Sequence, residues 1–234
     1  MHHVHFRIGR IAAMLCAGGA ALGGAHAVQA QEKYPDRSIR LVVPFPPGGQ
    51  TDTVSRQLGN RISPVIGQQF IIDNRAGASG ALGSAEVSRA KADGYTLLMA
   101  TTSTHTINPT AKPNVPYHPI RDFSPVAVVG TGPIAVSVHP SVPARNLKQL
   151  IAAVKAQPGA YSYGSSGVAS INNLAGELFK SKAGKLAILH VPYKGSGPSV
   201  QELIGGQIPI VCSTLNAALP HHRGGRERTL AVMK

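Results

Sequence analysis

Short apolar runs alternate with amphipathic stretches along most of the chain. Residues 38–45 form an apolar run that predicts a buried strand, and residues 70–73 predict another. Between them, residues 51–66 predict an amphipathic helix, because its apolar side chains recur at helical spacing: Val54, Leu58, Ile62 and Val65. This strand, helix, strand order is typical of a parallel sheet with right-handed crossovers.

The alternation continues through the first half. A Gly-rich stretch, "RAGASGALG", leads into a predicted helix at residues 81–92, and a predicted strand follows at residues 95–101. Residues 108–122 contain four prolines and predict an extended surface loop. Two apolar runs come next, at residues 126–129 and 134–139, and the "GTGP" between them is where we expect the chain to cross into a second domain.

The second half repeats the pattern. After a helix at residues 146–155 and a strand at 161–164, the pattern predicts a helix at 171–181 and a strand at 187–191. A helix that follows "PYKGSGPS" and ends at residue 203, a strand at 208–212, a helix near 215–221 and a strand at 229–232 complete the second half. The fold class predicted is α/β, with two lobes around a ligand cleft, as in a clamshell binding protein. We expect a signal peptide at residues 1–30, a first lobe at 31–131 and a second lobe at 132–234.

The N-terminus has the pattern of a secretory signal peptide. Arg7 and Arg10 precede a run of apolar and small residues, and small-x-small cleavage sites follow near residues 25–30. A membrane anchor is the alternative, although the run is shorter than the roughly 20 apolar residues that span a bilayer. Lipidation at Cys16 is disfavoured because Leu15 precedes it. We therefore expect a periplasmic location.

Charge and cysteine content narrow the function. Lys and Arg number 23 against 10 acids, a net charge of +13 that favours anionic partners. The basic residues are scattered through predicted helices with no arginine-aromatic platform, so nucleic acid is not an expected partner. Cys212 is the single cysteine after the leader, so we expect no intramolecular disulfide.

Small and polar residues follow several predicted strands. The loop at residues 46–49 could present the N–H groups of Gly48 to Thr51 to an anion at a helix start. The segment 101–104 offers hydroxyls after a buried strand. In the second lobe, "SSGVAS" carries Ser170 as an expected N-cap, and Asn172 and Asn173 fall in the first helical turn. Because parallel sheets bind ligands at the carboxyl ends of their strands, these segments predict one cleft for a carboxylate.

Motifs of other chemistries are missing from the sequence. It contains no P-loop, GxGxxG, G-x-S-x-G elbow, HExxH or CxxC. We therefore expect no enzyme, no catalytic residue, no cofactor and no metal site.

Longer stretches resemble a known family. The stretches are "YPDRSIRLVVPFPPGGQTD", "IIDNRAGASGALGSAEVSRAKADGYTLLMATTSTHTINP", "VPYHPIRDFSPVAVV", "LAGELFKSKAG" and "HVPYKGSGPSVQELIGGQI". In order and spacing they resemble the Bug family, the TctC-like receptors of tripartite tricarboxylate transporters, over residues 34–232. The resemblance implies a monomeric solute-binding receptor with the two-lobe fold of a type II periplasmic binding protein, or Venus flytrap, that delivers a small carboxylate to membrane permease subunits. It implies these ligand residues: Pro47, Gly48, Gly49, Thr102, Ser103, Thr104, Ser165, Ser166, Gly167 and Ser170.

The chain also departs from that family. Asn173 stands where a His is common, and Cys212 and Ser213 stand where an aromatic residue and an acid are usual. Family members continue for several dozen residues beyond "LAV", so we expect a chain truncated at its C-terminus. A ligand-presenting sensor of the same fold is the alternative function, and a secreted hydrolase would need a nucleophile and base pair that the sequence does not show.

Overall fold

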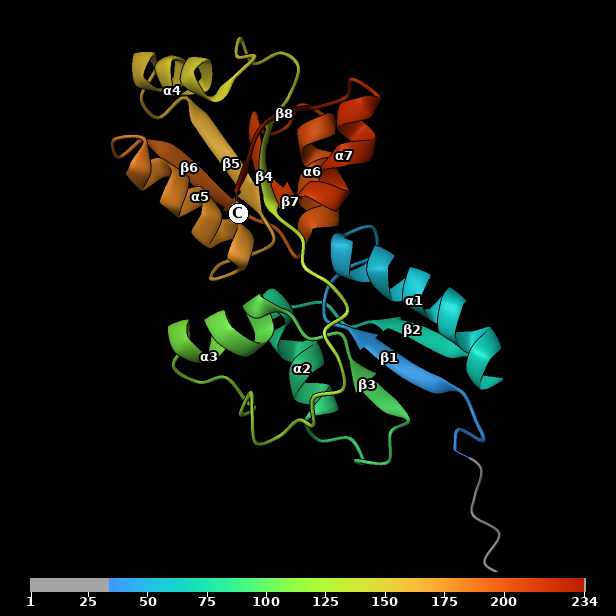
Figure 1. Ribbon diagram of the computed structural model, residues 1–234. Coiled ribbons are helices and arrows are strands. Elements are labelled where there is room, and N and C mark those ends of the chain that lie inside the picture. Colours follow the sequence, from blue (N-terminus) through green and yellow to red (C-terminus); the bar gives the residue numbers. More distant parts are fainter. Residues whose placement is uncertain (1–33, 234) are drawn as a thin grey trace, which may run out of the picture. The chain divides into compact units, whose positions relative to one another are not determined.

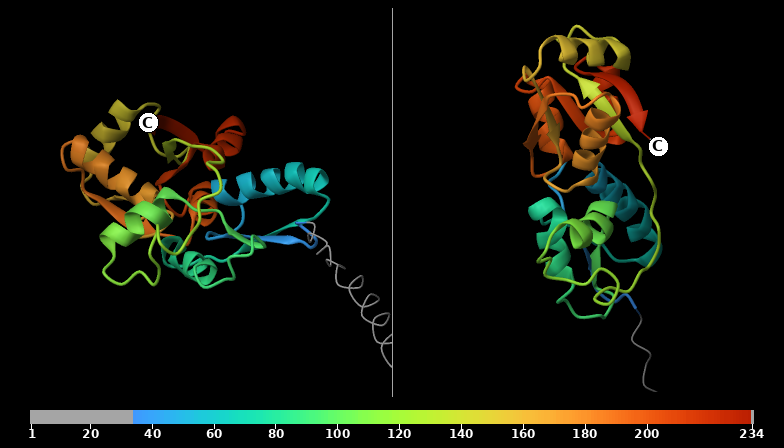
Figure 2. Two further views of the ribbon diagram at one scale, coloured as in Figure 1. Left: turned by 60° about the horizontal axis from the view of Figure 1, so that its bottom comes forward. Right: turned by 90° about the vertical axis from the view of Figure 1, so that its left-hand side faces the viewer.

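The first three strands form a parallel sheet. The computed structural model describes residues 34–233, and the predicted signal peptide lies outside them (Figure 1). Strand β1 (Ile39–Val43) lies between β2 (Phe70–Asn74) and β3 (Thr96–Leu98), and pairs parallel with both. Helix α1 (Gln50–Ile66) lies on one face and α2 (Ala81–Val87) on the other (Figure 2). The central position of β1 explains why Leu41, Val42 and Val43 are all buried.

The remaining strands form a five-stranded mixed sheet in the order β6-β5-β7-β4-β8. The strands are β4 (Ile134–Val138), β5 (Tyr161–Ser165), β6 (Ile188–Pro192), β7 (Ile210–Thr214) and β8 (Arg228–Met233). β5 pairs parallel with β6 and β7, whereas β4 runs antiparallel to β7 and β8.

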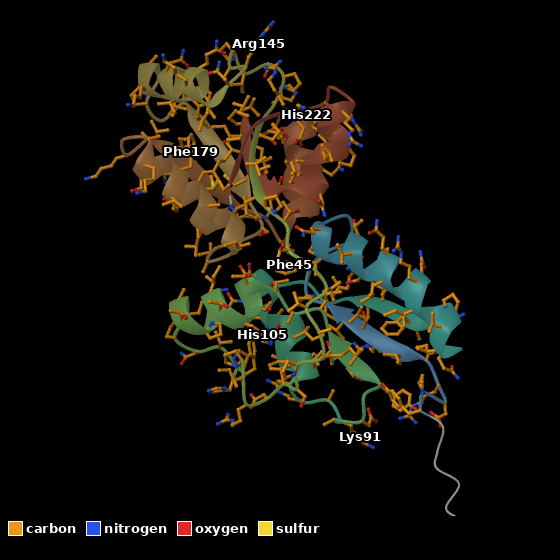
Figure 3. All side chains as sticks on the ribbon, viewed as in Figure 1. Phe45, Lys91, His105, Arg145, Phe179 and His222 are labelled. Atoms are coloured by element: carbon orange, nitrogen blue, oxygen red, sulfur yellow. The ribbon has the colours of Figure 1, made fainter. Side chains whose placement is uncertain are left out.

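Alternation along β7 divides the second core between two faces. Ile210 and Cys212 belong to the larger cluster, with α4 (Leu147–Ala156) and α5 (Ile171–Lys182) packed over it. Phe179 of α5 points into this core (Figure 3). Val211 faces the opposite way and packs on α6 (Ser196–Ile204), next to which lies α7 (Leu215–Arg223). The prediction of an α/β fold with two lobes is confirmed, with one sheet in each lobe. Residues from Pro35 onward form one compact unit that contains both sheets, so the division near residue 132 stays a prediction.

Some expected elements differ. The helix expected at residues 81–92 ends at Val87, because residues 88–94 turn before β3. The proline-rich stretch is partly helical: a π-helical turn (Ser103–Ile107) runs into α3 (Asn108–Ala111), where Pro109 is tolerated in the first turn. The apolar run at residues 126–129 pairs with no described strand, and Val126 and Val128 are 82% and 88% exposed. No helix among the described residues is long and apolar enough to cross a membrane.

Candidate functional site

The loop after β1 is fixed by a buried carboxylate. Gly48 has φ +84, and its N–H donates to Asp52 Oδ2 at 3.0 Å. Asn74 donates to Asp52 Oδ1 at 3.0 Å, and Arg56 forms an ion pair with it at 2.9 Å. Burial raises the pKa of Asp52, but these hydrogen bonds outweigh it and hold the pKa below its ordinary value. The Gly48 amide is therefore already paired, and the amides that the loop and helix start can offer begin at Gly49.

A left-handed turn precedes α2. Four consecutive residues have positive φ: Gly77 (+140), Ala78 (+50), Ser79 (+56) and Gly80 (+89). Two of them are not glycine, a conformation that costs about 1 kcal/mol or more per residue and persists only when neighbours hold it. Asn108 donates to Ser79 O at 3.0 Å and Lys112 donates to Ala78 O at 2.8 Å.

This turn contacts the second lobe. Ser79 Oγ donates to Val168 O at 2.7 Å, and a Cβ on Gly167 would lie 2.6 Å from Ser79 Oγ. Gly167, with φ +123, is thus required both by its backbone conformation and by this close approach. The strained turn and the Ser-Gly loop after β5 form one contact between the lobes.

The Thr/Ser segment after β3 makes a second contact. The Ile171 N–H, at the start of α5, donates to Ser103 Oγ at 3.0 Å. The Thr104 side chain is buried and bonds to Thr101, and its carbonyl accepts from Tyr117 Oη. Thr102 is exposed. Of the three predicted residues here, only Ser103 bonds to the other lobe.

The Ser-Gly loop after β5 is internally bonded. Ser170 caps α5 by accepting from Asn173 N at 3.2 Å, as its predicted N-cap role requires. Ser165 Oγ accepts from Gly167 N at 3.2 Å and lies 2.7 Å from His190 Nε2. Ser166 is buried and its hydroxyl bonds to none of the described residues. Ser166 is therefore the hydroxyl in this loop that is left for a ligand.

Ser165 and His190 resemble a catalytic nucleophile and its base, but the tautomer of His190 opposes that role. Asn173 Oδ1 accepts from Ala169 N at 3.0 Å, which fixes the amide so that Nδ2 faces Tyr163 Oη (2.8 Å) and His190 Nδ1 (3.4 Å). His190 Nδ1 is then the acceptor, so Nε2 carries the proton and donates to Ser165. A base must accept the serine proton at that nitrogen. The pair therefore shapes the loop and does not activate the hydroxyl.

The turn between β6 and α6 makes a third contact between the lobes. No residue of this turn is among the predicted ligand residues. A Cβ on Gly195 would lie 2.6 Å from Pro46 Cδ, and one on Gly197 would lie 2.7 Å from Pro47 O. Glycine at both positions lets the turn approach the Pro-Pro-Gly-Gly loop. "PYKGSGPS" carried the same signal as the other loops, namely small and polar residues directly after a strand.

Several buried polar atoms near the strand ends have no partner among the described residues. They include Asn172 Oδ1 in the first turn of α5, and Ser213 Oγ and Thr214 Oγ1 at the end of β7. A buried polar atom without a hydrogen bond costs about 1–3 kcal/mol. The sequence places Asn172 only on a helix start and gives no sign of these vacant positions, because they depend on which loops meet.

A cavity of about 220 Å³ adjoins the third contact. Its lining comes from the loop after β1 and from α6 and α7: Pro47, Gly48, Gly197, Pro198, Val200, Gln201, Ala217 and His221. Pro47 and Gly48 are the predicted site residues among them. The predicted serines and threonines lie elsewhere, at the first and second contacts. No group of three or more His, Cys, Asp or Glu residues within 34–233 could hold a metal ion.

Comparison with known proteins identifies the family. The model described as "Tripartite tricarboxylate transporter family receptor" matches residues 54–234. The chain belongs to this receptor family. The chain is 37% identical over 214 residues to Protein BugT of Bordetella pertussis, a match that covers 91% of this chain and 65% of BugT. The chain thus spans less than two thirds of the length of this curated relative.

Solved structures of similar proteins agree with this membership. R. palustris Rpa4515 with adipate is 38% identical with a TM-score of 0.82, covering 85% of this chain and 66% of that one. MatC from Rhodopseudomonas palustris with bound malate is 30% identical with a TM-score of 0.79, covering 85% and 67%. This chain therefore has the two-lobe type II fold of periplasmic binding proteins, and Rpa4515 and MatC each hold a dicarboxylate.

Proposed function

We propose that this receptor-family chain binds a small organic carboxylate between its two lobes, in the periplasm, and delivers it to the membrane subunits of a tripartite tricarboxylate transporter. The observation that carries the proposal is the meeting of strand-end segments from both lobes. Ser79 bonds to Val168, Ser103 bonds to Ile171, and Pro47 touches Gly197. Such contacts between loops at strand ends enclose a ligand when two lobes close.

The chemistry of these segments suits a carboxylate. The predicted residues supply N–H groups and hydroxyls and carry no charge themselves. Four helix starts lie beside them, and the first-turn N–H groups of a helix have no intrahelical partner and favour an anion. Those helices are α1, α5, α6 and α7. Neutral donors can hold a carboxylate without a buried arginine, since each charge-assisted hydrogen bond contributes about 1.5–3 kcal/mol.

We place the ligand against Gly49 and Ser166, with Ser103, Ser165, Gly167 and Ser170 shaping the loops around it. Thr102, Thr104, Pro47 and Gly48 complete the predicted set, of which Thr104 and Gly48 are already bonded within the first lobe. We propose that binding makes and breaks no covalent bond, that the protein acts as a monomer, and that the lobes divide near residue 132.

Thermal unfolding of residues 31–234 with mono-, di- and tricarboxylates tests the proposal. A ligand at 100 times its dissociation constant is expected to stabilise the fold by about 2.7 kcal/mol. Sodium chloride at equal ionic strength is the control for general screening of the positive charge. A folded protein whose melting temperature responds equally to chloride and to every carboxylate would contradict carboxylate binding.

A further inference from the structure

Asn172 occupies a position between the lobes. It is the second residue of α5 and is 1% exposed. The preceding N–H, that of Ile171, donates to Ser103 of the first lobe. Asn172 Nδ2 donates to Ser196 Oγ at 2.8 Å, and a Cβ on Gly49 would lie 3.9 Å from Ser196 Cβ. First-lobe residues therefore lie against both neighbours of the Asn172 amide: Ser103 bonds to Ile171, and Gly49 lies beside Ser196.

One atom of this amide is left unpaired. Asn172 Oδ1 is buried and accepts no hydrogen bond from the described residues. Asn172 Nδ2 makes the bond to Ser196, and the oxygen is the atom left over. An amide oxygen can only accept, whereas the unpaired hydroxyls of Ser213 and Thr214 can turn to donate or accept. Of these three atoms, Asn172 Oδ1 is the one that requires a donor; Asn108 Oδ1 is also a buried, unpaired amide oxygen but lies in the first lobe.

We propose that Asn172 Oδ1 accepts a hydrogen bond from the ligand, so that the receptor prefers carboxylic acids with a hydroxyl or ammonium group beside a carboxylate over the unsubstituted parent acids. This inference rests on the proposed function. Gly49, the N-cap of α1, lies against Ser196 and Gly197 in the first turn of α6, so both helix starts lie beside the residue that Asn172 bonds to. The ligand's carboxylate and its donor group are therefore neighbours. An unsubstituted parent acid leaves Asn172 Oδ1 unpaired. A site that hydrogen-bonds a polar group of its ligand rejects analogues without that group for the same reason.

Matched acids test the preference by calorimetric titration of residues 31–234. The two series are succinate, malate and aspartate, and glutarate, 2-hydroxyglutarate and glutamate. In the series whose length fits, a substituted acid is expected to bind at least about tenfold tighter than its parent, as one good hydrogen bond to a buried acceptor allows. Asn172→Ala is expected to bring this ratio to about one. Asn60→Ala, at an exposed asparagine of α1, is the matched control and should keep it.

The outcomes separate the two proposals. If a folded protein binds no acid of either series, the proposed function fails. If acids bind but the parent acid binds as tightly as its substituted partners, carboxylate binding stands and the role of Asn172 is refuted. A preference that Asn172→Ala leaves unchanged also refutes it. Should Asn172→Ala fail to fold, the comparison of acids on the unmodified chain still decides.

Discussion

Gly197→Ala tests whether the turn before α6 must touch the Pro-Pro-Gly-Gly loop. A Cβ at this position would lie 2.7 Å from Pro47 O and 3.3 Å from both Gly48 C and Gly49 N. Ordinary contact begins near 3.4 Å, so the two segments would have to separate by about 0.7 Å. The opposing atoms are backbone, so no side-chain rotation can relieve the clash. Overpacking of this kind costs about 1–3 kcal/mol.

The loss is expected in ligand affinity and not in folding. Residue 197 lies in the first turn of α6, where alanine is a better helix former than glycine, and the clash is with a different lobe. If the lobes close on the ligand through this contact, the clash in Gly197→Ala should weaken carboxylate binding by about 5- to 150-fold. Calorimetric titration gives the affinity, and thermal unfolding without ligand checks the fold.

Gly205→Ala, at the other end of α6, is the matched control. Its added Cβ would meet nothing closer than 3.4 Å, and its φ of −73 is open to any residue. Its affinity should stay within about twofold of that of the unmodified chain, a change below about 0.5 kcal/mol. Equal affinity of Gly197→Ala and the unmodified chain would refute the idea that this contact closes over the ligand.

Two further predictions concern the second lobe. Burial raises the pKa of Glu227 from 4.5 to about 7. Between pH 4.5 and pH 7 the folded state therefore keeps a proton that the unfolded state has lost. The free energy of unfolding falls as the pH rises through this range. Glu227→Gln should be more stable than the unmodified chain by up to about 3 kcal/mol at pH 8 and similar at pH 4.5, measured by urea unfolding at each pH; equal stability at pH 8 would contradict the buried charge. Burial also raises the pKa of the Cys212 thiol to about 12, so a thiol reagent at pH 8 should label residues 31–234 only after unfolding. Rapid labelling of the folded chain would show that the thiol is accessible.

Local sequence signals predicted the elements well. The spacing of apolar residues predicted α1, although its buried residues are Asp52, Ser55 and Gly59 and the predicted apolar residue Val65 is 83% exposed. Ser170 caps α5 through a bond that reaches only three residues. The "RAGASGALG" stretch marked a turn, since glycine supplies the positive φ. It did not show that Ala78 and Ser79 share that conformation, because Asn108 and Lys112 hold them there from 29 and 34 residues away.

The sequence by itself determined an α/β fold with small, polar segments at its strand ends, and it named most of those segments. Only the tertiary structure decided which of them meet. It brings the Pro-Pro-Gly-Gly loop against Gly197 and not against the Ser-Gly loop, which instead meets Ser79. It also leaves Asn172 Oδ1 buried and unpaired. These facts depend on how the two sheets approach each other. No local spacing encodes that approach, because hydrogen bonds between the lobes join residues far apart in the chain.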